Sequence, residues 1–389
     1  MSSTKTVTIT MRGAARLQSG HLWVYAADLV DAGGAQGGEI VAVADTRGRR
    51  LGWALYSDRS QIALRWIAEP DLEITRAFWR ERLLRAADLR HRMLGDVEAY
   101  RLVFAESDRL PSLIIDRYGD CFVLQTLSQG MEALKPLWVD LLVELFAPRA
   151  IVERNDVKVR ALEGLPLTKG VLYGTVPEHV EVTLGEGRFQ IDVLQGQKTG
   201  AFLDQQENYR AAARYARGRV LDGFCYGGGF AVHLAARAES VLAVDISAEA
   251  VEQARRNAER NSRTNVTVVE GNVFDLLREL DQRQERFDLI VLDPPAFAKS
   301  RAAVPGALRG YKEINLRALR LLQPEGVLVT CSCSYHMSEE MFLEMLRAAA
   351  ADARRSVRIL ERRTQASDHP ILLSMPETHY LKCVILQVF

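Results

Sequence analysis

The sequence predicts an α/β protein with a doubly wound parallel sheet in its C-terminal half and a small β-rich domain at its N-terminus. From about Gln190 onward, apolar strands alternate with helical segments, which is typical of a parallel sheet covered on both faces. Residues 1 to about 70 show short alternating strands separated by glycine pairs, as in a compact barrel. With 389 residues, the chain is long enough for two or three domains.

Composition excludes several classes of protein. The chain is 48% hydrophobic and 26% charged, as expected of a soluble globular protein and not of a collagen-like, disordered or coiled-coil one. No apolar run approaches the roughly 20 residues of a membrane helix, and residues 1–13 lack the apolar core of a signal peptide. We therefore expect a cytoplasmic protein that does not act at a membrane.

Charge and cysteine content narrow the choice further. The 50 basic residues balance 50 acidic ones, which argues against a non-specific DNA coat but leaves room for an RNA enzyme with one local basic face. Five cysteines, an odd number, do not indicate a disulfide framework in a cytoplasmic protein.

The N-terminal domain is expected to contain strands at residues 7–10, 39–43 and 61–66. A helix over 75–93 follows, and its polar face carries six arginines against Glu81 and Asp88, which is six minus two, or +4. Two interpretations of this face stay open: a solvated helix surface, and a surface that contacts nucleic-acid phosphates. The six arginines are Arg76, Arg80, Arg82, Arg85, Arg90 and Arg92.

The middle of the chain predicts a second small α/β unit. Strands are expected at 112–117, 121–126 and 150–154, with a helix over 133–145. The domain boundaries predicted from these changes of texture are 1–75, 76–185 and 186–389.

The C-terminal part predicts the parallel sheet element by element. Helices are expected from Gly229 onward and over 248–261 and 273–280. The strands expected between and after them lie at 220–222, 241–245, 266–270, 287–293, 326–331 and 380–389. In such sheets, ligands bind at the carboxyl ends of the strands.

The first two strand ends suggest a nucleoside-containing cofactor. The first strand leads into Asp222-Gly-Phe-Cys-Tyr-Gly-Gly-Gly-Phe230, where glycines allow the backbone to approach a ligand closely. The second ends at Asp245, which can accept hydrogen bonds from both hydroxyls of a ribose. These features fit NAD or S-adenosylmethionine, although the spacing is not that of the dinucleotide fingerprint and a plain tight turn is the alternative.

The third and fourth strand ends suggest groups for an adenine and for a planar substrate base. Asn272 offers an amide at the adenine edge, or alternatively caps the following helix. In Asp293-Pro-Pro-Ala-Phe297, the prolines fix the backbone, Asp293 can engage the polar edge of a base, and Phe297 can stack on its face. A rigid turn with a solvent-facing Asp293 is the structural alternative.

The fifth strand ends with two cysteines, Cys331 and Cys333. Together with His336 they could suggest zinc, but no second ligand pair at a useful spacing exists, so no metal site is predicted. A nucleophilic thiol is the better interpretation, because C5 of a pyrimidine becomes nucleophilic only after a thiolate adds to C6. A free thiol is a few per cent ionised at neutral pH, so such a site must favour the thiolate.

These motifs together resemble a known family. The chain is similar, over nearly its full length, to the bacterial 23S ribosomal RNA cytosine-5 methyltransferases of the large-subunit methyltransferase I type. The matching blocks are Glu153-Arg-Asn-Asp-Val157, Gln197-Lys-Thr-Gly-Ala-Phe-Leu-Asp-Gln205, Val220 to Phe230, Asp293 to Phe297, Arg309-Gly-Tyr-Lys-Glu-Ile-Asn315, Thr330-Cys-Ser-Cys-Ser334 and Pro370 to Phe389.

The resemblance implies three domains and a set of site residues. It implies an N-terminal β-barrel PUA domain that binds RNA, a small central α/β domain, and a C-terminal Rossmann-like class I methyltransferase domain that uses S-adenosylmethionine. Cys333 matches the family's nucleophile, Cys331 ranks second, and Asp293 is the second catalytic residue. Cofactor binding is expected at Lys198, Phe202, Asp222, Phe224, Gly228, Asp245, Asn272 and Asp293. Substrate binding is expected at Pro294, Phe297, Tyr311 and Lys312.

Three positions depart from the family's pattern. Gly227 stands where relatives often carry Thr, and Asp222 stands where Asn can occur. The other type of RNA cytosine-5 methyltransferase has an additional cysteine after the fourth strand, where this chain has proline, so product release must proceed without it.

The leading hypothesis is therefore methylation of C5 of a cytosine in 23S ribosomal RNA, free or in a pre-ribosomal particle. Methylation of a purine is the runner-up and needs no thiol. A non-catalytic RNA-binding assembly factor is the third hypothesis, and an NAD dehydrogenase fits least. The target nucleotide, the form of the RNA substrate, a homodimeric state and the group that removes the C5 proton stay open.

Overall fold

The computed structural model describes residues 4–298 and 300–389, which fall into two compact units. The first unit comprises Met1–Val182, Ile191–Ala201 and Ser367–Thr378, and the second comprises Thr183–Gln190, Phe202–Ala366 and His379–Phe389. The domain boundaries at residues 75 and 185 stay a prediction.

The N-terminal part of the first unit is built on a six-stranded sheet with the strand order β2-β6-β5-β4-β1-β3. A core of small and branched side chains, including Val7, Val24, Val41 and Leu64, is fully buried beneath it. The elements are β1 (Thr6–Ile9), α1 (Met11–Gln18), β2 (Trp23–Tyr25), β3 (Leu29–Asp31), β4 (Ile40–Asp45), β5 (Arg50–Tyr56) and β6 (Ile62–Ala68). The predicted β-rich N-terminal domain is confirmed.

A five-stranded sheet, with the order β11-β10-β9-β8-β7, forms the second part of this unit. Trp79 on α2 and Trp138 on α4 lie fully buried, with their rings 5.6 Å apart in an edge-to-face arrangement. The elements are α2 (Arg76–Leu94), β7 (Ala99–Phe104), β8 (Leu113–Tyr118), β9 (Cys121–Thr126), α3 (Gln129–Ala133), α4 (Lys135–Phe146), β10 (Ala150–Asn155) and β11 (Thr168–Gly174).

The arginine-rich face of α2 is not the uncompensated surface that its sequence indicates. Arg90 is only 1% exposed and donates to the Asp108 carboxylate at 2.8 Å, so the placement of Arg90 on a phosphate-binding face is wrong. Arg76 and Arg80 both pair with Glu144 of α4. Arg85 and Arg92 pair with Glu81 and Asp88 of the same helix, and Arg82 donates to the Ile67 carbonyl. Acidic partners from other elements, which helix periodicity does not reveal, neutralise much of this face.

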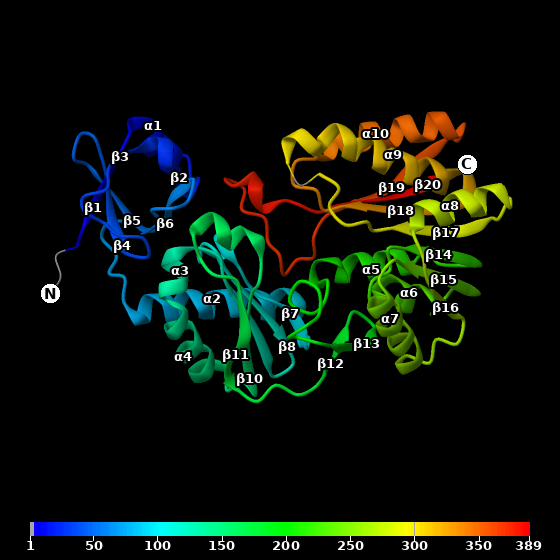
Figure 1. Ribbon diagram of the computed structural model, residues 1–389, viewed down its shortest axis with the longest axis horizontal. Coiled ribbons are helices and arrows are strands. Elements are labelled where there is room, and N and C mark those ends of the chain that lie inside the picture. The colour runs from blue at the N-terminus through cyan, green and yellow to red at the C-terminus, as the bar shows by residue number, and fades with distance from the viewer. Residues whose placement is uncertain (1–3, 299) are drawn as a thin grey trace. The chain divides into compact units, whose positions relative to one another are not determined.

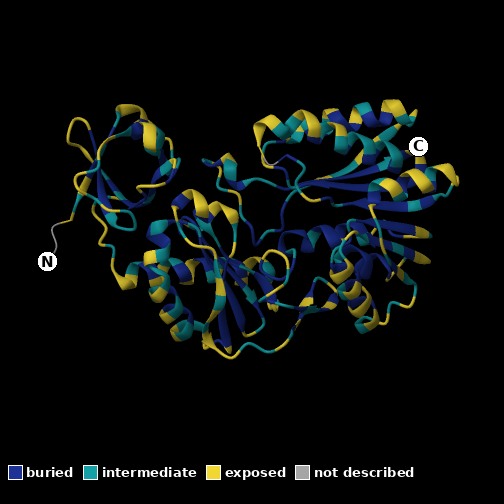
Figure 2. Cartoon of the chain, in the orientation of Figure 1, coloured by how far each residue is buried: buried dark blue, intermediate teal, exposed yellow. Residues whose placement is uncertain are grey.

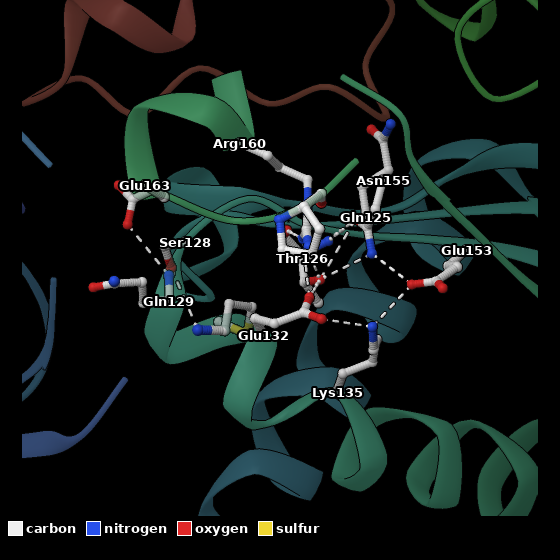
Figure 3. Close-up of polar contacts among 12 residues, drawn as sticks. Gln125, Thr126, Ser128, Gln129, Glu132, Lys135, Glu153, Asn155, Arg160 and Glu163 are labelled. Carbon is white, nitrogen blue, oxygen red and sulfur yellow. Dashed lines mark hydrogen bonds and ion pairs between the residues drawn. The ribbon is translucent and has the colours of Figure 1, made fainter. Parts of the chain in front are cut away.

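A buried polar network joins β9, β10 and α3 in the same unit (Figure 3). Asn155 accepts from the Thr126 backbone N–H at 2.8 Å and donates to Glu153 at 2.8 Å. The Lys135 ammonium bridges Glu132 and Glu153, at 2.6 and 2.9 Å. Fully buried Arg160 donates to the other oxygen of Glu132 at 2.9 Å. The Glu153–Val157 motif thus supplies internal partners to this unit.

Glu132 lies at the centre of this network, and its ionisation is expected to stabilise the first unit. Burial by itself would raise the pKa of Glu132, but hydrogen bonds from Arg160, Lys135 and Thr126 lower it from 4.5 to about 2. Since the folded-state pKa is the lower one, the stabilisation is complete above pH 4.5 and is lost as the pH falls towards about 2.

We predict that Glu132→Gln lowers the free energy of unfolding by about 1–3 kcal/mol at pH 7, because charged hydrogen bonds are lost. The difference from wild type should narrow as the pH falls from 7 to 3. All five tryptophans lie between Trp23 and Trp138, so tryptophan fluorescence during urea denaturation reports on this unit. The exposed Glu81→Gln serves as the control, with a small effect; a gap that stays constant at low pH would contradict the prediction.

The second unit is built on a seven-stranded sheet with the order β16-β15-β14-β17-β18-β20-β19. β14 to β18 pair in parallel, whereas β20 is antiparallel to both β18 and β19. The strands are β14 (Arg219–Gly223), β15 (Ser240–Asp245), β16 (Val266–Glu270), β17 (Phe287–Leu292), β18 (Leu322–Ser332), β19 (Val357–Arg363) and β20 (Lys382–Val388). The predicted doubly wound parallel sheet is confirmed.

Helices cover both faces of this sheet (Figure 1). One face packs against α8 (Val273–Gln282), α9 (Val304–Leu321) and α10 (Glu339–Ala353) through residues such as Leu277, Ile314 and Leu346. The other packs against α5 (Gln206–Ala213), α6 (Gly229–Leu234) and α7 (Ala248–Arg260) through residues such as Ala212 and Val251. The inner strands are mostly buried, the edge strands β16 and β19 are mostly not, and the helices carry exposed residues on their outer sides (Figure 2).

Several elements lie outside those that the sequence predicts. They are the hairpin of β12 (Val180–Leu184) and β13 (Gly187–Ile191), the helices α9 and α10, and the edge strand β19. Across the described ranges, none of the helices combines the length and apolarity needed to span a membrane.

Candidate active site

The carboxyl ends of β14, β15, β17 and β18 meet at one edge of the seven-stranded sheet. Gly223 of β14 pairs with Val244 of β15 on one side and with Leu292 of β17 on the other. Leu292 in turn pairs with Thr330 of β18. The segments that follow these four strands are therefore neighbours, as expected at the ligand-binding edge of a doubly wound sheet.

The loop after β14 has a strained backbone. Phe224 and Tyr226 have φ values of 66° and 46°, a region that residues with a side chain rarely adopt, and Gly228 has a φ of 80°. A Cβ added at Gly229 would lie 2.5 Å from the Tyr209 ring. Such strain persists where the surroundings over-determine the backbone, which is common at ligand-binding loops. The strained backbone therefore favours a ligand-binding loop over a plain turn at this position.

Asp222, at the end of β14, has an unsatisfied carboxylate oxygen. The side chain is fully buried, and Oδ2 accepts from the Ala231 backbone N–H at 2.9 Å. Oδ1 has no hydrogen-bond partner among the described residues. Burial raises the pKa of Asp222 well above its ordinary value, the Ala231 hydrogen bond opposes this, and the charges of Asp293 and Asp245 raise it further. A polar ligand at this edge would satisfy the free oxygen.

Asp245 and Asn272 follow the next two strands. Asp245 Oδ2 accepts from the Tyr226 N–H at 2.9 Å, and Oδ1 accepts from the Ser247 N–H at 3.0 Å. The carboxylate is thus held against the strained loop and keeps further acceptor capacity on both oxygens. Asn272 caps α8 by accepting from the Phe274 N–H at 2.9 Å, which confirms the capping interpretation and leaves its amide N–H₂ for other contacts.

The loop after β17 is anchored by Gln205, which the sequence does not indicate as a site residue. Gln205 donates to Asp293 Oδ2 at 2.9 Å and accepts from Asn208 at 2.6 Å, so the orientation of its amide is defined. Asp293 N–H donates to the Gly223 carbonyl at 3.4 Å, and Pro294 is buried. Gln205 is the last residue of the block Gln197–Gln205 that resembles the family, and this resemblance is the sequence signal that could have identified it.

The predicted substrate-binding residues do not all lie on a surface. Phe297 is partly exposed, and its ring centre lies 4.5 Å from that of Tyr311. Tyr311 is itself fully buried, and its hydroxyl bonds to Ser334 and Ser332 at 3.1 and 3.0 Å. Lys312 pairs with Asp352 at 2.7 Å. In this arrangement Tyr311 supports the end of β18, while Phe297 presents an aromatic face.

The five cysteines differ in access. Cys333 is partly exposed, and the other four are buried. Cys333 Sγ lies 4.0 Å from the carbonyl oxygen of Pro294, so it stands beside the Asp293 loop. Cys331 is fully buried and lies opposite Cys383 of β20 in the strand register. Of the two candidate nucleophiles, Cys333 is the one that a ligand can reach.

A second residue missed from sequence is Lys382, the first residue of β20. It lies opposite Ser332 in the register, is 4% exposed, and donates to the carbonyls of Ser334 and Tyr380 at 2.7 and 2.8 Å. It falls within the block Pro370–Phe389 that resembles the family, for which the sequence predicts only a closing strand.

The two remaining cofactor candidates are Phe202 and Lys198. The Phe202 ring meets that of Tyr226 edge to face at 5.1 Å, which places it against the glycine loop. Lys198 is exposed and belongs to the first unit, so its role stays a prediction. Within residues 4–298 and 300–389, no group of three or more His, Cys, Asp or Glu side chains is arranged to hold a metal ion.

Two family models match this chain. The model for a methyltransferase domain matches residues 216–372, which include all four strand ends of the candidate site. The model for a PUA-like domain matches residues 7–69, which is the part built on the six-stranded sheet.

Solved structures with the same fold include two that span the whole chain. One, from Streptococcus mutans, is assigned as a SAM-dependent methyltransferase; it covers 99% of this chain and 100% of its own, with a TM-score of 0.84 at 19% identity. The other is described as a methyltransferase complexed with SAH and has a TM-score of 0.83 at 18% identity. At this identity the likeness shows the fold.

Curated relatives are much more similar in sequence. Ribosomal RNA large subunit methyltransferase I of Tolumonas auensis is 44% identical over 379 residues, covering 94% of this chain and 95% of the relative. The protein of the same name from Shewanella amazonensis is 42% identical, covering 95% and 96%. The chain therefore belongs to the large-subunit ribosomal RNA methyltransferase I family.

Proposed function

We propose that this methyltransferase modifies C5 of a cytosine in large-subunit ribosomal RNA, through a covalent bond between Cys333 and C6 of the base. The observation that carries the proposal is the position of Cys333. It is the partly exposed thiol among five cysteines, and it stands beside the Asp293–Pro294 loop at the ligand-binding edge of the sheet. Methylation of an amino group needs no thiol there, whereas methylation of a pyrimidine C5 does.

The methyl donor is S-adenosylmethionine, and the residues at the strand ends fit it. The unsatisfied Oδ1 of Asp222 provides an acceptor, and Gly228 and Gly229 let the loop pack directly against Ala254 and Tyr209, where a Cβ would not fit. Asp245 offers acceptors for ribose hydroxyls, and Asn272 offers an amide for the adenine edge. When bound, the cofactor supplies a methyl group on a positively charged sulfur.

The chain's own residues then supply the activation of the base. The Cys333 thiolate would form a bond to C6, and the electron pair of the C5=C6 bond would move to C5. C5 would then take the methyl group, and the electron pair of the broken methyl–sulfur bond would stay on the sulfur. A base or water removes the C5 proton, the C5=C6 bond re-forms, and the C6–S bond breaks to return the thiolate. Each bond made to Cys333 is broken again, so the enzyme ends in its starting state.

Asp293 is positioned to hold the target base during these steps. Gln205 donates to Asp293 Oδ2 at 2.9 Å and fixes the orientation of the carboxylate, which in this proposal faces the N3 and N4 edge of cytosine. A carboxylate there favours protonated N3, which offsets the charge that develops on the ring when the thiolate adds. Phe297 offers a face on which the base can stack. A base within folded RNA must be unstacked to reach this loop.

Ribosomal RNA is the proposed partner because the relatives are named for it. The PUA-like domain is of a kind found in RNA-modifying proteins, and we infer that it contributes to RNA binding. The paired arginines of α2 contribute less than their number suggests, since Arg76, Arg80, Arg85 and Arg92 already contact acidic side chains.

Asp245→Ala should weaken S-adenosylmethionine binding about five- to 150-fold, because two ribose hydroxyls lose a charged acceptor at about 1–3 kcal/mol in total. Isothermal titration calorimetry measures this directly. Asp275→Ala is the matched control: its side chain is 69% exposed on the first turn of α8, and its loss should leave the affinity unchanged. Equal affinities for wild type and Asp245→Ala would remove Asp245 from the site.

Cys333→Ala should abolish methyl transfer while keeping the fold and cofactor affinity, since a small partly exposed side chain changes little volume. Cys331→Ala should retain substantial activity. RNA with 5-fluorocytosine at the target should trap a covalent adduct with wild type, because fluorine cannot leave as a proton. Denaturing electrophoresis and peptide mapping detect the adduct.

The outcomes of the trapping experiment separate the hypotheses. An adduct that forms equally well with Cys333→Ala makes another residue the nucleophile, Cys331 first. A wild-type enzyme that forms no adduct and yields a methylated purine would replace cytosine-5 methylation by purine methylation.

A further inference from the structure

A buried ammonium group lies beside the candidate nucleophile. Lys382 is 4% exposed, and its Nζ donates to the carbonyl of Ser334, the residue that follows Cys333. Its second acceptor is the carbonyl of Tyr380, at 2.8 Å. Lys382 also lies opposite Ser332, the residue that precedes Cys333. The lysine therefore contacts the backbone on one side of the cysteine and pairs with the strand on the other.

This ammonium lacks the partner that a buried cation ordinarily has. Across the described part of the chain, Lys382 takes part in no ion pair, and its two hydrogen bonds go to neutral carbonyls. Burying a charge without a counter-ion is unfavourable, so such a group is retained mainly where its charge is used. An ammonium has three donors, and two carbonyls leave one that can face an anion.

The charged and titratable groups that face Lys382 are few. They are Cys333 and Glu339, both of which interact with its charge. Glu339 is paired with Arg362 at 2.7 Å, so its charge is already opposed. The neighbouring Tyr311 hydroxyl bonds to Ser332 and Ser334, and burial raises the pKa of Tyr311, so it stays neutral. Cys333 is the group left to become the counter-ion.

We propose that Lys382 is a positioning residue that holds Cys333 as a thiolate in the resting enzyme. The inference rests on the proposed function, in which Cys333 is the nucleophile, and names the group that makes it reactive. The thiol proton leaves to solvent before RNA binds, and Lys382 keeps its own proton throughout. When the C6–S bond breaks, the thiolate again lies near the positive charge of Lys382.

The proposal has a definite dependence on pH. Burial lowers the pKa of Lys382 to about 8, and the charges of Cys333 and Glu339 oppose that shift. Below that value the ammonium is present and stabilises the thiolate. As the pH rises through about 8 the ammonium is lost, and with it the support of Cys333.

Alkylation of Cys333 by iodoacetamide tests this without RNA or cofactor. Rates are measured by peptide mass spectrometry between pH 6 and pH 10, and the midpoint of each profile reports the ionisation of the thiol. In wild type the midpoint should lie below the value of about 8.5 for a free cysteine. Lys382→Met, which conserves length and removes the charge, should slow alkylation at pH 7 about tenfold and raise the midpoint. Lys382→Arg should restore most of the wild-type rate.

Two internal standards keep the result interpretable. Arg358→Met removes one exposed positive charge from β19 of the same sheet and should leave the profile unchanged. The four buried cysteines should stay unlabelled in a folded variant, so their alkylation reports unfolding.

Either of two results overturns the proposal. One is a wild-type midpoint at or above about 8.5, which needs no variant. The other is a folded Lys382→Met protein with an unchanged profile. Failure of the proposed function is distinguishable, because it appears in the trapping experiment as an adduct that does not require Cys333, whatever the ionisation of the thiol.

Discussion

The arrangement of the site depends on the parallel pairing of β14 with β15 and β17, and of β17 with β18. Neighbouring strands lie about 4.8 Å apart and end at one edge, so residues that are distant in sequence arrive within one to three strand spacings of each other. Asp222, Asp245, Asp293 and Cys333 all reach the same edge for this reason.

Because the strand ends meet at one edge, several carboxylates lie close together where water has little access. Burial and the neighbouring carboxylates Asp293 and Asp245 raise the pKa of Asp222, which shows how costly a further anion is there. Two donors oppose this charge locally: the Tyr226 backbone N–H in the strained loop donates to Asp245, and the Gln205 side chain donates to Asp293. In the proposed resting state, the buried Lys382 ammonium opposes the charge of the Cys333 thiolate.

In the first unit, by contrast, buried charged side chains pair with charges of the opposite sign. Its buried ionic groups are matched inside the unit: Arg90 with Asp108, Arg160 with Glu132, and Lys135 with two glutamates. Matched buried pairs define a unique packing and leave little charge for ligands. In the second unit, by contrast, Asp222 keeps an unsatisfied carboxylate oxygen and Lys382 donates only to neutral carbonyls among the described residues.

The sequence by itself determined the fold class and the local motifs. Apolar periodicity located the strands of the parallel sheet, and the residues after them, Asp245, Asp293 and Cys333, could be named because each motif is contiguous. The capping role of Asn272 was visible for the same reason, since a cap bonds to a backbone two residues away.

Only the tertiary structure decided what is made by distant segments. Arg90 has the spacing of a surface residue, yet Asp108 draws it into the interior. Gln205 acts on Asp293 from 88 residues away, and Lys382 lies opposite Ser332, the residue before Cys333, because β20 pairs antiparallel with β18. The hydrophobic pattern of the sequence indicates which residues of one element are buried. The partner of a buried polar group depends instead on which strands and loops become neighbours, and only the assembled sheet determines that.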